Sequence, residues 1–240
     1  LDIKEYIKVS LKDYYPSRNS IKSPRIKPVK IIAEEIRYLN PNENNYVLNN
    51  LSFLIDYNNK VLIKGASGCG KSTLLDILCG LKSNSSGKLD YFIEDKKINL
   101  LDKKFFASWM PQYPSIANKS LGFNITFEED ESKWDLSKLE FAKKVARVNF
   151  VHSINNKSEN LTFISGDRLS GGQIQRIGIA RTIYMNMGLM LFDEPTSSID
   201  KDTSEAILKD IEKYCHNSTI ILVSHKENNS ITFDKVVRLD

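Results

Sequence analysis

A glycine-rich loop between a short apolar run and an amphipathic segment constrains the fold of this chain more than any other feature. Residues 61–63 predict a buried strand, and residues 73–78 predict a helix that ends at Gly80. The loop between them matches the spacing G-x-x-x-x-G-K-[ST] at every fixed position. Strand, glycine loop and helix in this order predict an α/β fold with a phosphate-binding site. The candidate binding residues are Gly65, Ser67, Gly68, Cys69, Gly70, Lys71, Ser72 and Thr73.

The chemistry expected of this loop follows from its residue types. Glycines allow successive backbone N–H groups to point at phosphate oxygens, and the following helix adds its positive N-terminal end. Lys71 is expected to reach the β- and γ-phosphates of a nucleoside triphosphate, and Ser72 to bind Mg²⁺. We interpret Cys69 as a small filler residue.

Two acidic residues follow a second buried run. Residues 189–192 are apolar and predict a strand that ends in Asp193 and Glu194. Open α/β sheets bind their ligands at the carboxyl ends of the strands, so Asp193 is expected to belong to the Mg²⁺ shell. Glu194 is expected to polarise the attacking water as general base.

The rest of the chain alternates between strand and helix patterns. Apolar residues alternate in residues 51–55, ahead of a turn at Asn58 and Asn59, and residues 219–223 predict another buried strand. Helices are expected over residues 134–148, 171–185 and 201–213; the first carries its apolar positions at Leu136, Leu139, Ala142 and Val145. This alternation favours a mostly parallel sheet.

A second glycine motif narrows the class of protein. Residues 169–173 read Leu-Ser-Gly-Gly-Gln at the start of a predicted helix, which alone could be only a helix N-cap. The segment continues to Arg181 in a pattern that, together with the phosphate loop, resembles the ATP-binding-cassette (ABC) ATPases. The resemblance covers residues 30–240. It implies that Ser170, Gly171, Gly172 and Gln173 bind ATP.

Further positions match the motifs of this family in the right order. The resemblance implies that Gln112 contacts Mg²⁺ or the attacking water, and that His225 contacts the γ-phosphate. It places Asp200 at the end of the family's D-loop, residues 197–200, and among the nucleotide-binding residues. Tyr38 corresponds to the aromatic residue that stacks on adenine, and Tyr46 is a competing candidate.

The resemblance also implies an architecture and partners. We expect a P-loop NTPase core with a mostly parallel sheet, an N-terminal antiparallel β subdomain, and an inserted α-helical subdomain at about residues 113–168. Residues 1–29 are expected to be a linker from a preceding domain. A head-to-tail dimer with a second ABC domain, identical or not, would place each ATP between Lys71 of one copy and Ser170 of the other. A membrane domain is the expected further partner.

Export is the expected direction of transport, because the lead-in from Leu1 resembles the linker of a fused exporter. An importer ATPase and a non-transport ABC ATPase are the alternatives; Pro195, where many exporters have alanine, favours the importer.

The net charge of +4 and its even spread argue against nucleic acid as a partner. Three cysteines fit a reducing compartment. No run of about 18 apolar residues occurs, so the membrane domain is expected outside the given residues, in the same polypeptide. From the family resemblance, the chain itself is expected on the cytoplasmic face of a membrane, the bacterial inner membrane.

Overall fold

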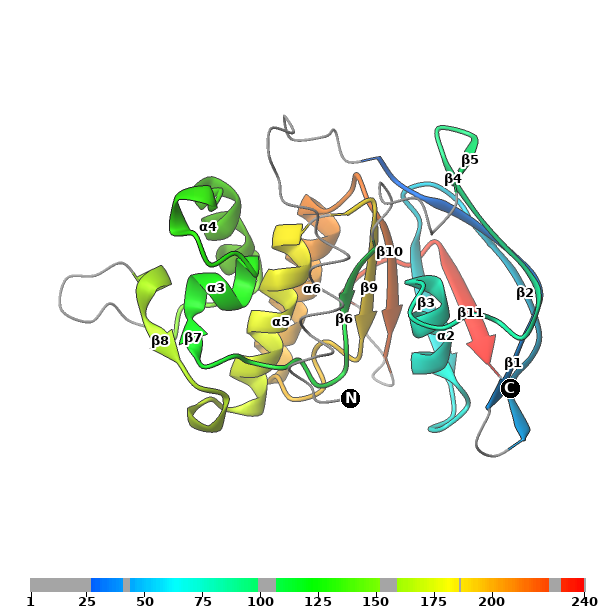
Figure 1. The fold of residues 1–240 in the computed structure, drawn as a ribbon, viewed down its shortest axis with the longest axis horizontal. Coiled ribbons are helices and arrows are strands. Elements are labelled where there is room, and N and C mark those ends of the chain that lie inside the picture. Colours follow the sequence, from blue (N-terminus) through cyan, green and yellow to red (C-terminus); the bar gives the residue numbers. More distant parts are fainter. Residues whose placement is uncertain are drawn as a thin grey trace.

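The computed structural model of the chain describes residues 27–40, 44–98, 107–151, 159–185, 187–224 and 230–239. Within them, two larger sheets and a group of helices lie next to one another along the longest axis of the molecule (Figure 1). In chain order the elements are β1 (Lys30–Asn40), β2 (Asn45–Ile55), β3 (Lys60–Gly65), α2 (Lys71–Leu78), β4 (Ser86–Ile93), β5 (Lys96–Ile98), β6 (Ala107–Met110), β7 (Lys119–Ser120), α3 (Leu121–Thr126), η1 (Glu131–Lys133), α4 (Leu136–Val145), η2 (Glu159–Leu161), β8 (Phe163–Ile164), η3 (Gly166–Arg168), α5 (Gly171–Met185), β9 (Leu189–Asp193), α6 (Lys201–Tyr214), β10 (Thr219–Val223) and β11 (Lys235–Leu239).

Five of these strands form a sheet in the order β11-β3-β10-β9-β6, and every neighbouring pair in it is parallel. This confirms the predicted α/β class. The carboxyl ends of β3, β6 and β9 lie at the same edge of the sheet, where an open α/β sheet binds its ligands. The sequence pattern does not identify β11, because this short edge strand alternates exposed and buried residues and lacks an apolar run.

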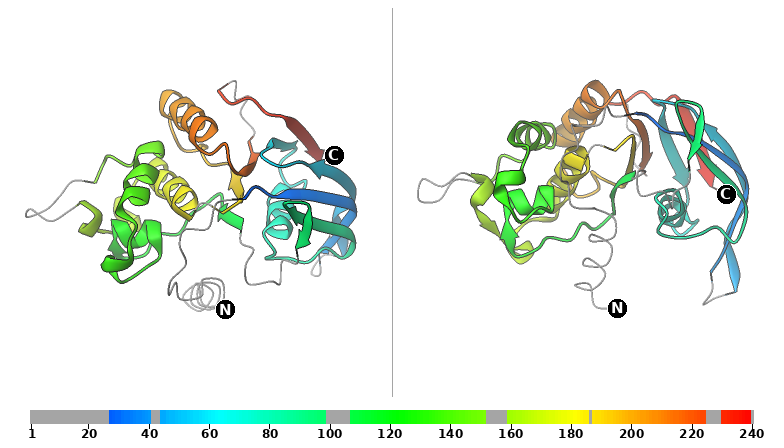
Figure 2. Two further views of the ribbon diagram at one scale, coloured as in Figure 1. Left: turned by 90° about the horizontal axis from the view of Figure 1, so that it is seen from above. Right: turned by 45° about the horizontal axis from the view of Figure 1, so that its top comes forward.

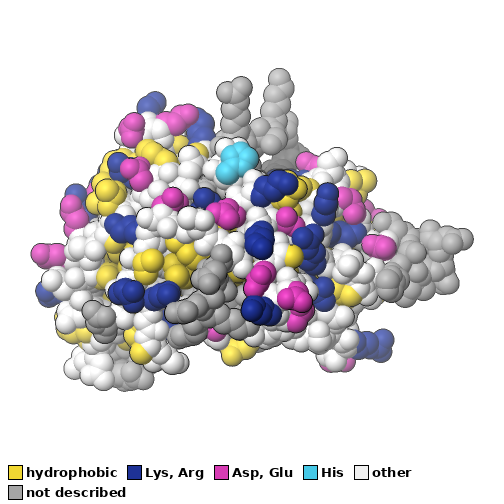
Figure 3. Space-filling model, turned by 180° about the vertical axis from the view of Figure 1, so that it is seen from behind, with side chains coloured by type: hydrophobic (Ala, Val, Ile, Leu, Met, Phe, Trp, Pro, Cys, Tyr) yellow, Lys and Arg dark blue, Asp and Glu magenta, His cyan; other side chains and the backbone are white. Residues whose placement is uncertain are grey.

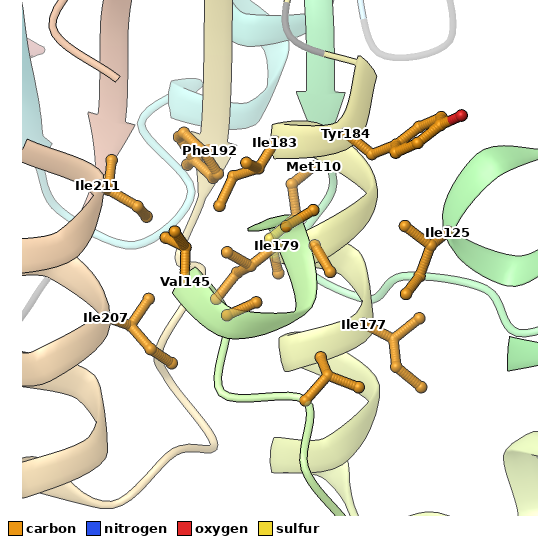
Figure 4. Packing of buried hydrophobic residues seen from close by; sticks show 14 of the residues in the cluster. Met110, Ile125, Val145, Ile177, Ile179, Ile183, Tyr184, Phe192, Ile207 and Ile211 are labelled. Carbon is orange, nitrogen blue, oxygen red and sulfur yellow. The ribbon is translucent and has the colours of Figure 1, made fainter. Parts of the chain in front are cut away.

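The central strands are buried on both faces, so successive side chains enter two different cores. In β9, Met190 and Phe192 pack with α5 and α6, whereas Leu189 and Leu191 pack with α2 and the antiparallel strands. Figure 4 shows the first core, in which apolar side chains of α4, α5, α6 and β9 point into one cluster. The continuous apolar run at residues 189–192 is therefore a consequence of a sheet that is covered on both sides.

The antiparallel sheet has the order β2-β1-β4-β5 and packs on the far side of α2 (Figure 1). Its presence confirms the predicted antiparallel β portion. Irregular pairing interrupts β1 between Ala33 and Ile36, where Glu35 has φ 50. Gly87 of β4 lies against this bulge, and a Cβ atom there would come within 2.3 Å of the Glu35 carbonyl oxygen.

A helical lobe lies on the opposite side of α5 from the two sheets, as both views of Figure 2 show. It contains α3, α4 and the short β7–β8 pair, and it packs on α5 through Ile125, Leu139 and Val145. Helix α4 is shorter than the predicted 134–148, because Asp135 caps it by accepting a hydrogen bond from the Lys138 N–H (3.0 Å). Of the four apolar positions, Leu139, Ala142 and Val145 are buried, whereas Leu136, the first residue of the helix, is exposed.

The predicted linker, residues 1–29, falls mostly outside the described residues, so this boundary stays a prediction. Within the described part, Val29 is fully buried and both its N–H and its carbonyl oxygen bond to the Thr219 hydroxyl. On the face shown in Figure 3, basic and acidic side chains are intermixed. No helix among the described residues is long and apolar enough to span a bilayer.

Candidate active site

The loop between β3 and α2 has a backbone that only glycine accommodates at its last position. Gly70 has φ 97, and a Cβ atom there would lie 2.8 Å from Cγ1 of Val47. Gly70 accepts the first helical hydrogen bond, from the Leu74 N–H at 2.8 Å, so α2 begins directly after it. The first turn of α2 carries no acidic residue. Its N-terminal N–H groups and helix dipole are therefore suited to an anion.

Lys71 is folded into the loop rather than extended into solvent. Its side chain is buried, and Nζ donates hydrogen bonds to the carbonyl oxygens of Gly65 (3.0 Å) and Ala66 (2.7 Å). These carbonyls compensate a buried ammonium that would otherwise be costly. Gly65 itself allows β11 and Cys69 to pack closely, because a Cβ atom on it would lie 2.6 Å from the Leu239 carbonyl oxygen and 2.5 Å from Cys69 Sγ.

A cavity of about 250 Å³ opens above the loop. Four segments that are distant in the sequence line it: β2, the β3–α2 loop with the first turn of α2, the second residue after β6, and the residue after β9. The lining residues are Val47, Ser67, Gly68, Gly70, Lys71, Ser72, Thr73, Gln112 and Glu194. The structure thus brings together most of the phosphate-loop residues, the predicted base and the predicted glutamine. Cys69 instead packs against the second core, which lies between the parallel sheet, α2 and the antiparallel strands, as expected for a filler residue.

Glu194 has an unusual backbone conformation. Its φ is 47, in the left-handed region that non-glycine residues seldom adopt. Its N–H donates to the Val223 carbonyl oxygen at 3.1 Å. Its carboxylate accepts a hydrogen bond from Nε2 of Gln112 at 3.2 Å, across the cavity. The backbone of Glu194 is therefore anchored to β10, and its carboxylate is held at the cavity by Gln112, two residues after β6.

Asp193 ends β9 with a buried carboxylate. Burial raises the pKa of Asp193, and the charges of Glu194 and Asp76 raise it further. A hydrogen bond from Ser72 and the charge of Lys71 oppose that rise without cancelling it. A cation beside Asp193 would favour the ionised carboxylate.

The donor set fits a nucleotide-bound Mg²⁺. A hydroxyl (Ser72) and a carboxylate (Asp193) lie in contact, with an amide (Gln112) at the same cavity. Among the described residues, no group of three or more His, Cys, Asp or Glu side chains could hold a metal ion. Mg²⁺ usually binds through one or two protein ligands plus phosphate oxygens, which this arrangement permits.

The second glycine motif forms the N-terminus of α5. The Ser170 hydroxyl accepts a hydrogen bond from the Gln173 N–H (3.3 Å), and Gln173 Oε1 accepts one from the Ser170 N–H (2.9 Å). This reciprocal pair is a capping box. Gly172 lies against the loop after β9, because a Cβ atom on it would lie 2.8 Å from the Ser198 carbonyl oxygen. Residues 170–173 do not line the cavity of Lys71.

The remaining predicted positions have other surroundings. Asp200 caps α6 by accepting from the Thr203 N–H at 2.9 Å, and this bond lowers the pKa of Asp200. Tyr38 lies on β1 opposite Leu48, with Lys82 Nζ 5.7 Å from its ring centroid, and is not among the lining residues. Tyr46 is 55% exposed. His225 lies outside the described residues.

The comparisons with known proteins assign the chain to a family. The model of the family described as "ABC transporter" matches residues 48–197, which include the phosphate loop, Gln112, residues 170–173 and Glu194. The chain belongs to this family.

Named relatives of this ABC domain are transport proteins. The lacticin-481/lactococcin-DR transport/processing ATP-binding protein of Lactococcus lactis is 34% identical over 213 residues, which cover 88% of this chain and 30% of that protein. The glutathione/L-cysteine transport system ATP-binding/permease protein CydC of Haemophilus influenzae is 28% identical over 214 residues, covering 88% and 37%. The ABC domain thus corresponds to about a third of each relative.

A solved structure supports the same assignment. A bacterial Atm1-family ABC exporter with ATP bound matches with a TM-score of 0.76 and 25% identity, over 94% of this chain and 39% of that one. The fold is therefore that of a P-loop NTPase domain, and the chain is similar to part of an ATP-binding/permease protein and of an ABC exporter.

Two residues near the site were missed in the sequence. Val47 lines the cavity from β2, and Gln175 of α5 bonds to the carbonyl oxygen of Glu194 at 3.3 Å. Gln175 follows Gly172 by three residues and so lies on the same face of the helix, which is a signal that could have identified it. Nothing in the local sequence indicates Val47, because its position depends on how the two sheets pack.

Proposed function

We propose that this ABC domain binds and hydrolyses ATP and thereby powers export by a membrane domain. The observation that supports it best is the meeting of three chain segments at one cavity. Lys71 and Ser72 come from the phosphate loop, Gln112 from the end of β6 and Glu194 from the end of β9. Phosphate binding, metal binding and water activation thus find their residues within one space.

The phosphate loop would bind the triphosphate. The N–H groups at the start of α2 face the cavity, and Lys71 Nζ keeps one N–H beyond the two that bond to loop carbonyls. Ser72 and Asp193 would hold Mg²⁺, with Gln112 completing the protein side. When bound, Mg²⁺ neutralises charge on the β- and γ-phosphate oxygens.

Glu194 would act as general base toward the attacking water. Its carboxylate lies in the cavity and is oriented by Gln112 at 3.2 Å. General-base catalysis contributes about 10²–10⁴-fold to a rate. His225 would contact the γ-phosphate and Tyr38 the adenine ring, as the family resemblance implies.

A second ABC domain would complete each site. Residues 170–173 display a capped helix N-terminus that lies outside the cavity of Lys71, which supports a role toward ATP held by another copy. Asp200, beside this surface at the start of α6, would face the same interface. The head-to-tail dimer would contain two identical or two related domains.

The relatives support the transport role. Their names describe transport and ATP-binding/permease proteins, and the matched structure is an exporter. We infer that a membrane domain belongs to the same polypeptide. The ABC domain would then lie on the cytoplasmic side of the bacterial inner membrane. Nucleic acid is not a proposed partner.

Glu194→Gln in the full-length protein tests this function. The variant keeps the side-chain volume and the contact with Gln112 but lacks a basic carboxylate. We expect ATP binding to persist, a nucleotide-bound dimer to accumulate, and turnover to fall by about 10²-fold or more. ATPase assays, binding of a fluorescent ATP analogue and size-exclusion chromatography measure these three properties. Hydrolysis at the unmodified rate would refute Glu194 as the base.

A further inference from the structure

Gln175 connects α5 to the turn that carries Glu194. Its side-chain nitrogen Nε2 donates to the carbonyl oxygen of Glu194 (3.3 Å) and to the hydroxyl of Ser197 (2.6 Å). Its oxygen Oε1 accepts from the Ser198 N–H at 2.9 Å. The residue is 3% exposed. Both hydrogens and the oxygen of one buried amide are thus used to hold the two ends of residues 194–198.

The turn held in this way has a strained start. Glu194 has φ 47, and its carbonyl oxygen accepts from the Ser197 N–H (3.2 Å) as well as from Gln175. A glutamate in the left-handed region persists only where its surroundings hold it. A change in φ would rotate the Cα–Cβ bond and move the carboxylate away from Gln112. The orientation of the carboxylate therefore depends on what anchors the backbone of the turn.

The turn also sits directly on the helix that carries Gln175. Gly172 lies one turn earlier on α5, and a Cβ atom there would come within 2.8 Å of the Ser198 carbonyl oxygen. Close approach at Gly172 and hydrogen bonding at Gln175 act on the same face of the helix. Residues 194–198 are consequently fixed to α5 at two points.

We propose that Gln175 is a positioning residue for Glu194. This positioning role rests on the proposed function, because it requires that Glu194 is the base for ATP hydrolysis. Gln175 does not line the cavity, so it acts through the backbone of Glu194 and not on the nucleotide. Its loss should change the rate of the chemical step and leave nucleotide binding intact.

The test is Gln175→Met in the full-length protein, with ATPase kinetics and binding of a fluorescent ATP analogue. A misplacement of a catalytic group by about 1 Å costs about 10²-fold, so kcat should fall by about 10–100-fold. KM and the Kd of the analogue should stay within about twofold of the values for the unmodified protein. The contacts that bind ATP equally in the ground state and the transition state are unchanged. Gln175→Glu keeps the acceptor for Ser198 but loses the donor to Glu194, and it should lower kcat in the same way.

Thr182→Val is the matched control. Thr182 is buried on the same helix, and its hydroxyl donates to the carbonyl oxygen of Gly178 at 3.1 Å, within α5. Valine removes one buried hydrogen bond at nearly constant shape. The control should change thermal stability but keep kcat within twofold of the unmodified protein. A drop in kcat equal to that of Gln175→Met would overturn the positioning role.

A double variant separates positioning from a general structural effect. Residues that act as a unit give non-additive losses. Gln175→Met should therefore cause no further loss of rate in the Glu194→Gln background, and an additive loss would overturn the proposal. Normal kcat in both Gln175 variants would overturn it alone, and leave the proposed function standing. Absence of hydrolysis by the unmodified protein would overturn both.

Discussion

Replacing Gly70 by alanine is expected to damage this domain far more than replacing Gly68. Both glycines have positive φ, 97 at Gly70 and 82 at Gly68. A Cβ atom at Gly70 would lie 2.8 Å from Val47 Cγ1 and 2.9 Å from Leu48 Cδ2, whereas at Gly68 it would meet nothing within 4 Å. The two substitutions share the conformational cost, and only one adds a steric clash.

The magnitudes follow from these two contributions. An L-residue in the left-handed region costs about 1–2 kcal/mol, which is the whole effect expected at Gly68. Overpacking against Val47 and Leu48 adds about 1–3 kcal/mol at Gly70. Gly70→Ala should therefore lower the free energy of unfolding by about 2–5 kcal/mol in total. It should also narrow the cavity from the side of β2, so that affinity for an ATP analogue falls.

Urea unfolding of the two variants, followed by tryptophan fluorescence, measures the difference. The chain has two tryptophans, Trp109 and Trp134, which pack with the second and the first core respectively. Equal losses of stability at Gly68 and Gly70 would refute the steric argument. It would mean that β2 and the loop do not approach each other as described.

Two further predictions concern buried titratable groups. The raised pKa of Asp193 means that the folded state retains its proton at a higher pH than the unfolded state, so this residue stabilises the fold at low pH and loses that contribution as pH rises through its raised pKa. Asp193→Asn should remove this dependence and raise stability at neutral pH while weakening Mg²⁺-dependent turnover; identical stability-versus-pH curves from urea unfolding would contradict it. Burial raises the pKa of the Cys79 and Cys215 thiols to about 12, so a thiol reagent at pH 8 should label Cys69 first. Mass spectrometry of the labelled peptides measures the order of labelling. If Cys215 were labelled before Cys69, the thiol at the C-terminal end of α6 would be accessible to solvent, which would contradict its burial.

Much of the fold could be predicted from the sequence because the informative features are local. The bounds 171–185 predicted for one helix agree with α5, since a capping Ser-x-x-Gln motif marks its start. The strand at residues 219–223 was likewise predicted from a continuous apolar run, which a sheet buried on both faces requires. Edge strand β11 and the exposed Leu136 were not predicted, because the first has a weak pattern and the second depends on where the helix begins.

The candidate site divides in the same way. The spacing of residues 65–72 by itself predicted a glycine loop that leads into a helix and is suited to phosphate, because a short loop and the helix after it supply their own N–H groups and glycines. The sequence likewise placed Asp193 and Glu194 at the end of a buried strand. None of these features depends on which distant segment of the chain packs against the loop or the strand.

Only the tertiary structure decided which distant segments meet. Parallel pairing of β6 and β9 brings Gln112 within 3.2 Å of Glu194, and packing of the antiparallel sheet places Val47 beside Gly70. The contact of α5 with the turn after β9 brings Gln175 to the carbonyl oxygen of Glu194, a pairing that the sequence analysis did not predict. Local motifs are set by short-range backbone geometry, whereas these contacts depend on how two sheets and a helix pack across long stretches of chain.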